Sequence, residues 1–179
     1  MIMNKIIKLS SPFTEECAVS LKAGDICRFT GTLWTGRDAA HRKLVELLDA
    51  GKELPVDLTN TLIYFVGPCP APPGRPIGSA GPTTSGRMDA YSPRLMRECA
   101  LRGMVGKGKR SKEVINAMVE TKSVYFAATG GAGALIAQCV KSAEVVAFPE
   151  LGPEAIYKLE VEDFPLVVAI DTKGNSILK

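Results

Sequence analysis

Residues 62–87 read LIYFVGPCPAPPGRPIGSAGPTTSGR. The opening LIYFV is an uninterrupted apolar run, which predicts a buried strand. The remainder, residues 67–87, is dense in Gly and Pro and therefore predicts a long loop. Loops of this length inside a compact domain are usually functional or disordered, and we interpret this one as functional because it carries specific polar residues.

Strands and helices are predicted both before and after residues 62–87. Before it, apolar alternation predicts strands at residues 2–9 and 27–33 with a turn at residues 23–25, and a helix is expected from Asp38, its predicted cap, to about Ala50. After it, we expect helices at residues 92–102 (closed by Gly103), 111–120, 134–140 and 154–159, strands at 124–128, 145–148 and 166–171, and turns at 105–108 and 129–133. Strands and helices mix throughout, so the predicted class is a layered α/β fold in a single domain over residues 1–179.

Composition excludes several classes of protein. The chain has 179 residues, of which 46% are apolar and 23% charged, as in ordinary globular proteins. A net charge of +3 is too small to indicate nucleic-acid binding. The first ten residues, MIMNKIIKLS, are too polar for a signal peptide or a membrane span, and no run reaches the roughly 18 apolar residues that a span needs.

The cysteines predict no metal centre. Their number is odd, they are widely scattered, and no CxxC pair occurs. They are Cys17, Cys27, Cys69, Cys99 and Cys139. Reduced thiols in a cytoplasmic protein are the expected state, so any metal that the protein uses should be held by something else.

Three basic residues fall at predicted turns. Arg37 stands at a helix start, Arg87 follows three hydroxyls, and Lys107 lies between two glycines. Together they could bind a small dianion, because arginine grips a planar carboxylate with two hydrogen bonds and lysine adds a point charge. Three separate solvated charges are the alternative, which spacing alone favours.

The hydroxyl run and the single histidine leave similar alternatives open. Thr83, Thr84 and Ser85 could donate to substrate oxygens, or they could only bond the local backbone. His41 is more typical of a packed or capping residue than of a catalyst. The TGGAG stretch at residues 129–133 could bind an anion but lacks the spacing of a dinucleotide site.

Six motifs in one order resemble a known family. They are TGRDAAH (35–41), YFVGPCP (64–70), GPTTSGRMD (81–89), GKG (106–108), GGAGAL (130–135) and LGPEAIYKLEVEDFPLVVAIDTKGN (151–175). Together they resemble the β subunit, or the equivalent C-terminal domain, of the iron–sulfur class I fumarate hydratases and L-tartrate dehydratases. The resemblance covers nearly the whole chain, and TGRDAAH and GPTTSGRMD are its most specific signals.

The resemblance implies a fold, a reaction and a partner. The fold would be a swivelling β/β/α domain, and the reaction the interconversion of fumarate and L-malate, with L-tartrate dehydration as the alternative substrate choice. A [4Fe–4S] cluster would be held by a separate α subunit, in a heterodimer or an α2β2 heterotetramer. Arg37, Arg87 and Lys107 would hold the substrate carboxylates, and Thr83 would abstract the proton. A non-enzymatic anion-binding or regulatory module is the alternative of another class.

Overall fold

One mixed sheet organises the parts of the chain that this computed structural model describes, residues 5–128 and 133–179. Its strands are β1 (Ile7–Ser10), β2 (Ile26–Thr35), β3 (Leu62–Tyr64), β4 (Gly103–Gly106), β5 (Val124–Ala127), β6 (Val140–Ala147) and β7 (Ile156–Ile170). Its helices are α1 (Glu15–Ser20), α2 (Asp38–Asp49), α3 (Ser92–Cys99), α4 (Lys112–Thr121) and α5 (Gly133–Gln138), with short 3₁₀ turns η1 (Ser85–Met88) and η2 (Pro149–Glu154). Over the described ranges, no helix has both the length and the apolar character needed to cross a membrane.

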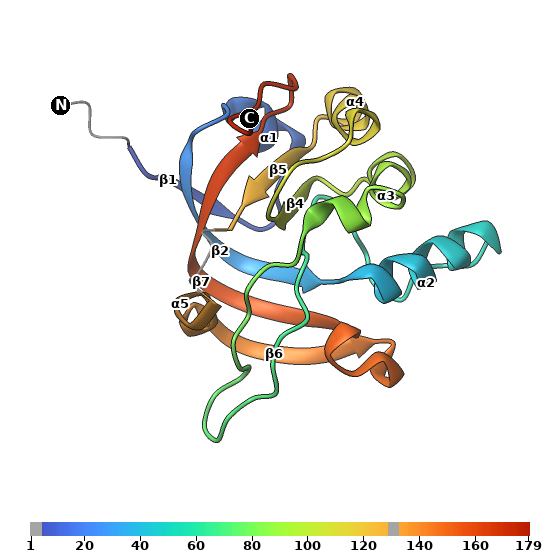
Figure 1. The fold of residues 1–179 in the computed structure, drawn as a ribbon, viewed down its shortest axis with the longest axis vertical. Coiled ribbons are helices and arrows are strands. Elements are labelled where there is room, and N and C mark those ends of the chain that lie inside the picture. The colour runs from blue at the N-terminus through green and yellow to red at the C-terminus, as the bar shows by residue number, and fades with distance from the viewer. Residues whose placement is uncertain (1–4, 129–132) are drawn as a thin grey trace.

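The long strand β7 closes the sheet on itself. Strands β1 to β5 are parallel neighbours in chain order. β7 runs antiparallel to β2, from Ile26↔Val167 to Trp34↔Lys158, and also antiparallel to β5. The pairings therefore lead from β2 through β3, β4, β5 and β7 back to β2 (Figure 1). Strand β6 pairs with the first part of β7, from Ile156 to Val161.

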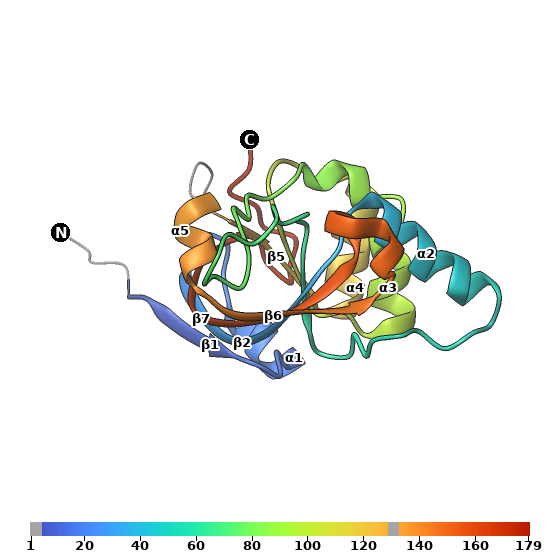
Figure 2. The same ribbon diagram turned by 90° about the horizontal axis from the view of Figure 1, so that it is seen from below.

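Side chains of the parallel strands alternate between the two faces of the sheet, and a hydrophobic core covers each face. Tyr64, Val105 and Phe126 point into one core, which Leu159 and Phe164 of β7 complete. Their neighbours Ile63, Met104 and Tyr125 point into a second core, together with Leu44, Leu95 and Met118 from the helices. Figures 1 and 2 show these helices, α2, α3 and α4, gathered at one side of the molecule. The predicted α/β layering is thus confirmed.

Several predicted elements are confirmed with small shifts. The buried strand after residue 62, the strand starting near Cys27 and the turn around Gly24 are present. Ser111 caps α4 as its hydroxyl accepts from the Val114 amide at 3.2 Å. Helix α2 begins at Asp38, but its N-cap is Arg37 and not Asp38. The predicted turn at residues 129–133 and the start of the strand at residues 2–9 lie largely outside the described residues.

Other predicted elements are wrong. The helix predicted at residues 154–159 is absent, because Glu154 ends η2 and the segment from Ile156 pairs with β6 as the start of β7. The turn at 105–108 is wrong at its start, since Val105 and Gly106 belong to β4. Gly103 does not close α3, which ends where Ala100 adopts a left-handed φ of 53°. Helix α1 was not expected from the sequence, and β6 and β7 are much longer than predicted.

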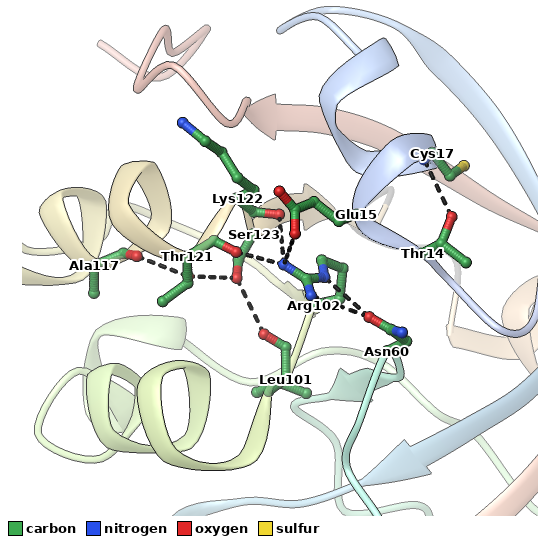
Figure 3. Close-up of polar contacts among 10 residues, drawn as sticks. All are labelled: Thr14, Glu15, Cys17, Asn60, Leu101, Arg102, Ala117, Thr121, Lys122 and Ser123. Carbon is green, nitrogen blue, oxygen red and sulfur yellow. Dashed lines mark hydrogen bonds and ion pairs between the residues drawn. The ribbon is translucent and has the colours of Figure 1, made fainter.

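A half-buried arginine ties the amino-terminal ends of the parallel strands together (Figure 3). Arg102, just before β4, donates through Nε and Nη2 to Asn60 Oδ1, at 3.2 and 3.1 Å. Its Nη1 donates to the last carbonyls of α4, at Thr121 and Lys122, and lies 4.0 Å from the Glu15 carboxylate of α1. One side chain thus satisfies an asparagine oxygen and a helix C-terminus that would otherwise lack donors.

Replacing Arg102 by Met is therefore expected to lower the free energy of unfolding by about 2 kcal/mol, because the stem is retained but the half-buried acceptors lose their donors. Urea denaturation of the purified chain measures the change. Arg97→Met is the matched control, because Arg97 pairs with Glu120 on the surface and should cost less than about 1 kcal/mol. Equal losses in the two variants would contradict this role for Arg102.

Candidate functional site

The predicted site residues lie at the carboxyl ends of the parallel strands. Arg37 follows β2, the Gly/Pro-rich loop follows β3, and Lys107 follows β4. In both open and closed sheets of parallel strands, ligands bind at this edge because the connecting loops gather there. The sequence therefore delivers Arg37, Thr83, Arg87 and Lys107 to one edge.

The segment 83–85 is built into this edge as an extra piece of sheet. The Thr83 amide donates to the Phe65 carbonyl at 2.8 Å, and the Ser85 amide donates to the Lys107 carbonyl at 2.9 Å. Thr84 also forms a parallel bridge with Lys107. The segment thus lies between the continuations of β3 and β4, with Thr83 and Lys107 on neighbouring backbones.

Close packing at Gly106 makes this insertion possible. A Cβ at Gly106 would lie 1.9 Å from Ser85 Oγ and 2.8 Å from the Phe65 ring. The Ser85 hydroxyl instead lies against β4 and is hydrogen-bonded to the Tyr125 hydroxyl at 2.8 Å. Tyr125 also donates to the Gly108 carbonyl at 2.8 Å, so one phenol ties both sides of the inserted segment to β5.

A buried ion pair anchors the chain immediately after the segment. The Arg110 side chain is fully buried and donates through Nε to Asp89 Oδ1 at 2.7 Å, while Asp89 Oδ2 accepts from the Ser111 amide at 2.7 Å. The guanidinium also lies over the rings of Phe65 and Tyr125, 5.2 and 4.9 Å from their centroids. Burial lowers the pKa of Arg110, and the Asp89 carboxylate opposes that shift.

Three elements enclose the stem of Arg37. Its backbone carbonyl accepts from the amide and the ring Nδ1 of His41, at 3.0 and 2.8 Å. A Cβ at Gly67 would lie 3.1 Å from Arg37 Cδ and 3.2 Å from the Pro153 carbonyl, so a larger residue there would crowd the stem. On the far side, the Glu154 carboxylate lies 3.8 Å from Arg37 Nε.

Arg37 and Arg87 line the same pocket, whose volume is about 350 Å³. Arg87 reaches it from η1 and places its Nε 3.0 Å from Asp38 Oδ2. The complete lining is Arg37, Asp38, Ala39, Arg42, Arg87, Tyr91 and Glu154. Thr83 and Lys107 lie outside this lining, so the structure brings the predicted residues together as two pairs rather than as one cluster of four.

Sequence reasoning missed Arg42, Asp38 and Glu154 as pocket residues. Arg42 lies one helical turn beyond Asp38, so the helix period could have placed both on one face. No pattern pointed to a pocket role for Glu154, which was predicted to begin a helix at residues 154–159. In the structure it is instead the last residue of η2, which joins β6 to β7. Its place in the pocket depends on how that connection meets α2.

His41 packs beneath the site and does not line the pocket. Its side chain is buried, and its ring lies 5.4 Å from that of Phe65 between centroids. Burial lowers the pKa of His41 to about 4, so the ring is neutral at physiological pH. The Nδ1–H donates to the Arg37 carbonyl, which fixes the tautomer and fits the packing role predicted from the sequence.

Within the described ranges, no metal-binding arrangement occurs. No three His, Cys, Asp or Glu side chains come close enough to hold an ion. The five cysteines are free thiols on separate elements, and burial raises the pKa of Cys27 to about 12. The described side chains therefore do not fit an iron–sulfur cluster.

Comparisons with known proteins agree with the motifs. The family described as Fumarase C-terminus matches residues 2–179. The anaerobic class I fumarate hydratase of Escherichia coli (strain K12) is 48% identical over 151 residues, which are 84% of this chain but 28% of that protein. The putative L(+)-tartrate dehydratase subunit beta of Methanocaldococcus jannaschii is 41% identical over 169 residues, 92% of this chain and 87% of that protein.

A third relative, the putative class I fumarate hydratase of Geobacillus stearothermophilus, is 38% identical over 177 residues, 97% of this chain and 34% of that protein. The chain thus spans 28% and 34% of these two fumarate hydratases but most of the length of the tartrate dehydratase subunit. The match over almost every residue leads to one conclusion: this chain belongs to the fumarase C-terminus family.

Proposed function

We propose that this chain is the β subunit of a hydro-lyase that interconverts fumarate and L-malate. It would complete its active site with an α subunit that carries a [4Fe–4S] cluster. The observation that carries the proposal is the pocket in which Arg37 and Arg87 meet at the carboxyl edge of the parallel strands. Its volume of about 350 Å³ suits a four-carbon dicarboxylate, and two guanidinium groups match two carboxylates.

The proposed chemistry gives the cations two tasks. Arg37 and Arg87 bind and orient the carboxylates, because a planar guanidinium fork fixes direction as well as charge. Loss of the C3 proton of malate places negative charge on the adjacent carboxylate. Lys107 and the arginines stabilise that charge more strongly in the transition state than in the ground state, which accelerates the reaction.

Thr83 is the proposed group for proton abstraction. Its hydroxyl lies on the segment that bridges to Lys107, and Arg87 follows on the same turn. Threonine is a poor base at neutral pH unless its alkoxide is stabilised, and neighbouring cations provide such stabilisation. The assignment of Thr83 rests on the family motif GPTTSGRMD and on this neighbourhood.

The cluster belongs to the partner in this proposal. The described residues offer no ligand set for it, so we derive no step of the reaction through it. This chain contributes carboxylate binding, orientation and the proton-transfer candidate. We further propose a single domain of the swivelling β/β/α type, assembled as a heterodimer or an α2β2 heterotetramer in the cytoplasm, a compartment that suits five free thiols.

L-tartrate dehydration is the second candidate function. The 41% identity to the putative L(+)-tartrate dehydratase subunit beta of Methanocaldococcus jannaschii favours it. Tartrate is also a four-carbon dicarboxylate, so the same cations would serve both substrates. A non-enzymatic anion-binding module differs from both in needing no cluster-bearing partner.

Co-purification followed by steady-state assay distinguishes these functions. We expect the chain to co-purify with a cluster-bearing α subunit, and the pair to hydrate fumarate with a higher kcat/KM than it shows on L-tartrate. The chain alone should show neither iron–sulfur absorbance nor turnover. A strong preference for tartrate would reverse the choice of substrate, and bound iron with turnover in the single chain would overturn the subunit proposal.

Two substitutions at Thr83 test its role. Thr83→Ser keeps the hydroxyl and should retain most activity, whereas Thr83→Val keeps the shape and should lose about 10²-fold or more in kcat, as expected when a proton-transfer group is removed. Cluster content is checked in each preparation of the pair. Thr84→Val is the matched control on the adjacent, exposed residue. Near-normal turnover by Thr83→Val would show that another group takes the proton.

A further inference from the structure

The two acidic residues of the pocket, Asp38 and Glu154, each lie beside one of two of its three arginines, Arg87 and Arg37. We infer that Asp38 and Glu154 are positioning residues, each holding one arginine at its Nε edge so that the outer fork of the guanidinium faces the ligand. The inference rests on the proposed function, because it concerns how the same pocket binds a dicarboxylate. It assigns roles to two acids that would otherwise be expected to repel such a ligand.

The Arg87–Asp38 pair shows the arrangement most clearly. Arg87 Nε lies 3.0 Å from Asp38 Oδ2, and the two residues come from different elements, η1 and the first turn of α2. Contact through Nε leaves the two Nη groups free, and these form the fork that grips a carboxylate with two parallel hydrogen bonds. The Arg87 side chain is 56% exposed, so without this contact it would sample many rotamers.

Glu154 stands in the same relation to Arg37. Its carboxylate lies 3.8 Å from Arg37 Nε, a nitrogen that is buried and has no hydrogen-bond partner among the described residues. The stem of Arg37 runs past Gly67 and the Pro153 carbonyl, so the η2 connection that carries Glu154 also confines the arginine laterally. Again the acid faces the inner edge of the guanidinium.

Folding stability alone does not account for the Arg87–Asp38 and Arg37–Glu154 pairs. Partly exposed ion pairs contribute little to folding, since solvent screens them and ordering the side chains costs entropy. Two other ion pairs have their acids on the same elements but do not line the pocket. Asp49 at the end of α2 pairs with Arg94 of α3, and Glu150 of η2 pairs with Lys43 of α2. They serve as controls of matched charge, element and pairing.

The alternative role for the acids predicts the opposite sign. If Asp38 and Glu154 merely competed with the ligand for the guanidinium groups, neutralising them would tighten dicarboxylate binding. If they orient the arginines, neutralising them weakens binding and slows turnover, because misdirected groups lose both affinity and rate. The direction of the change in KM therefore decides between the two roles.

The test uses the enzyme reconstituted with its cluster-bearing partner. Asp38→Asn and Glu154→Gln should each raise KM for the substrate about tenfold, with a fall in kcat, a size typical of a modest misplacement. Asp49→Asn and Glu150→Gln should leave KM within twofold of wild type by the same criterion. An unchanged or lowered KM in Asp38→Asn and Glu154→Gln would overturn the inference.

A double-substitution cycle shows whether each acid acts through its arginine. In an Arg87→Ala background, Asp38→Asn should have little further effect, because the group that it orients is gone. Full additivity of the two losses would overturn the positioning role, and the same holds for Glu154→Gln with Arg37→Ala. A general loss of folding would add in both backgrounds and would appear in the melting temperature.

Binding of succinate, a non-reacting four-carbon dicarboxylate, separates this inference from the proposed function. Calorimetry on the same complexes gives its Kd. If wild type binds succinate but turns over neither fumarate nor tartrate, the proposed function fails, and Kd in the acid variants still tests the inference. If Arg87→Ala loses succinate while Asp38→Asn binds as wild type does, the inference fails and the function stands.

Discussion

The ion pair between Arg110 and Asp89 is the interaction on which the candidate site depends. A fully buried guanidinium must be paired, and removing one partner of such a pair costs about 3–5 kcal/mol because the remaining charge is left uncompensated. Here the pair joins the connection after β4 to the turn that carries Thr83 and Arg87. Stacking of Arg110 between Phe65 and Tyr125 adds the continuation of β3 and the strand β5 to the same unit.

The surrounding architecture explains why the Arg110–Asp89 pair lies at the edge of the sheet that carries the candidate site. Strand β7 returns antiparallel between β5 and β2, so it fills one face of the parallel strands while α2, α3 and α4 fill the other. With both faces buried, the carboxyl edge is where the loops that follow the parallel strands gather, and the candidate site lies there. The inserted segment at this edge lets a Gly/Pro-rich loop end in a fixed position.

The sequence predicted elements whose cause is local. LIYFV reads as buried because it is uniformly apolar, and residues 111–120 read as a helix because their apolar residues recur with the helical period. Gly103 and Gly106 were interpreted as the end of a helix and part of a turn, but both are required by close packing. A Cβ at Gly103 would lie 2.0 Å from Leu62, and one at Gly106 would lie 1.9 Å from Ser85. Such contacts join segments distant in sequence and leave no local pattern.

The candidate site also combines features that the sequence signals with features that depend on contacts between distant segments. Spacing alone favoured separate solvated charges for Arg37 and Arg87, and the family motifs were needed to expect them together. Their meeting in one pocket requires the turn after β3 to reach the start of α2. The pairing with Asp38 and Glu154 depends further on where η2 crosses that helix, which no composition or periodicity encodes.

Hydrogen exchange of two backbone amides tests most directly whether the turn is held as part of the sheet. The amides of Thr83 and Ser85 donate to Phe65 and Lys107, and Asp89 and Arg110 anchor the chain beside them. We predict that both amides are protected in the wild-type chain. In Asp89→Asn they should lose protection selectively, while the β4 and β5 amides keep theirs. Exchange of Thr83 and Ser85 in the wild type as fast as in the exposed loop at residues 71–76 would contradict the preformed turn.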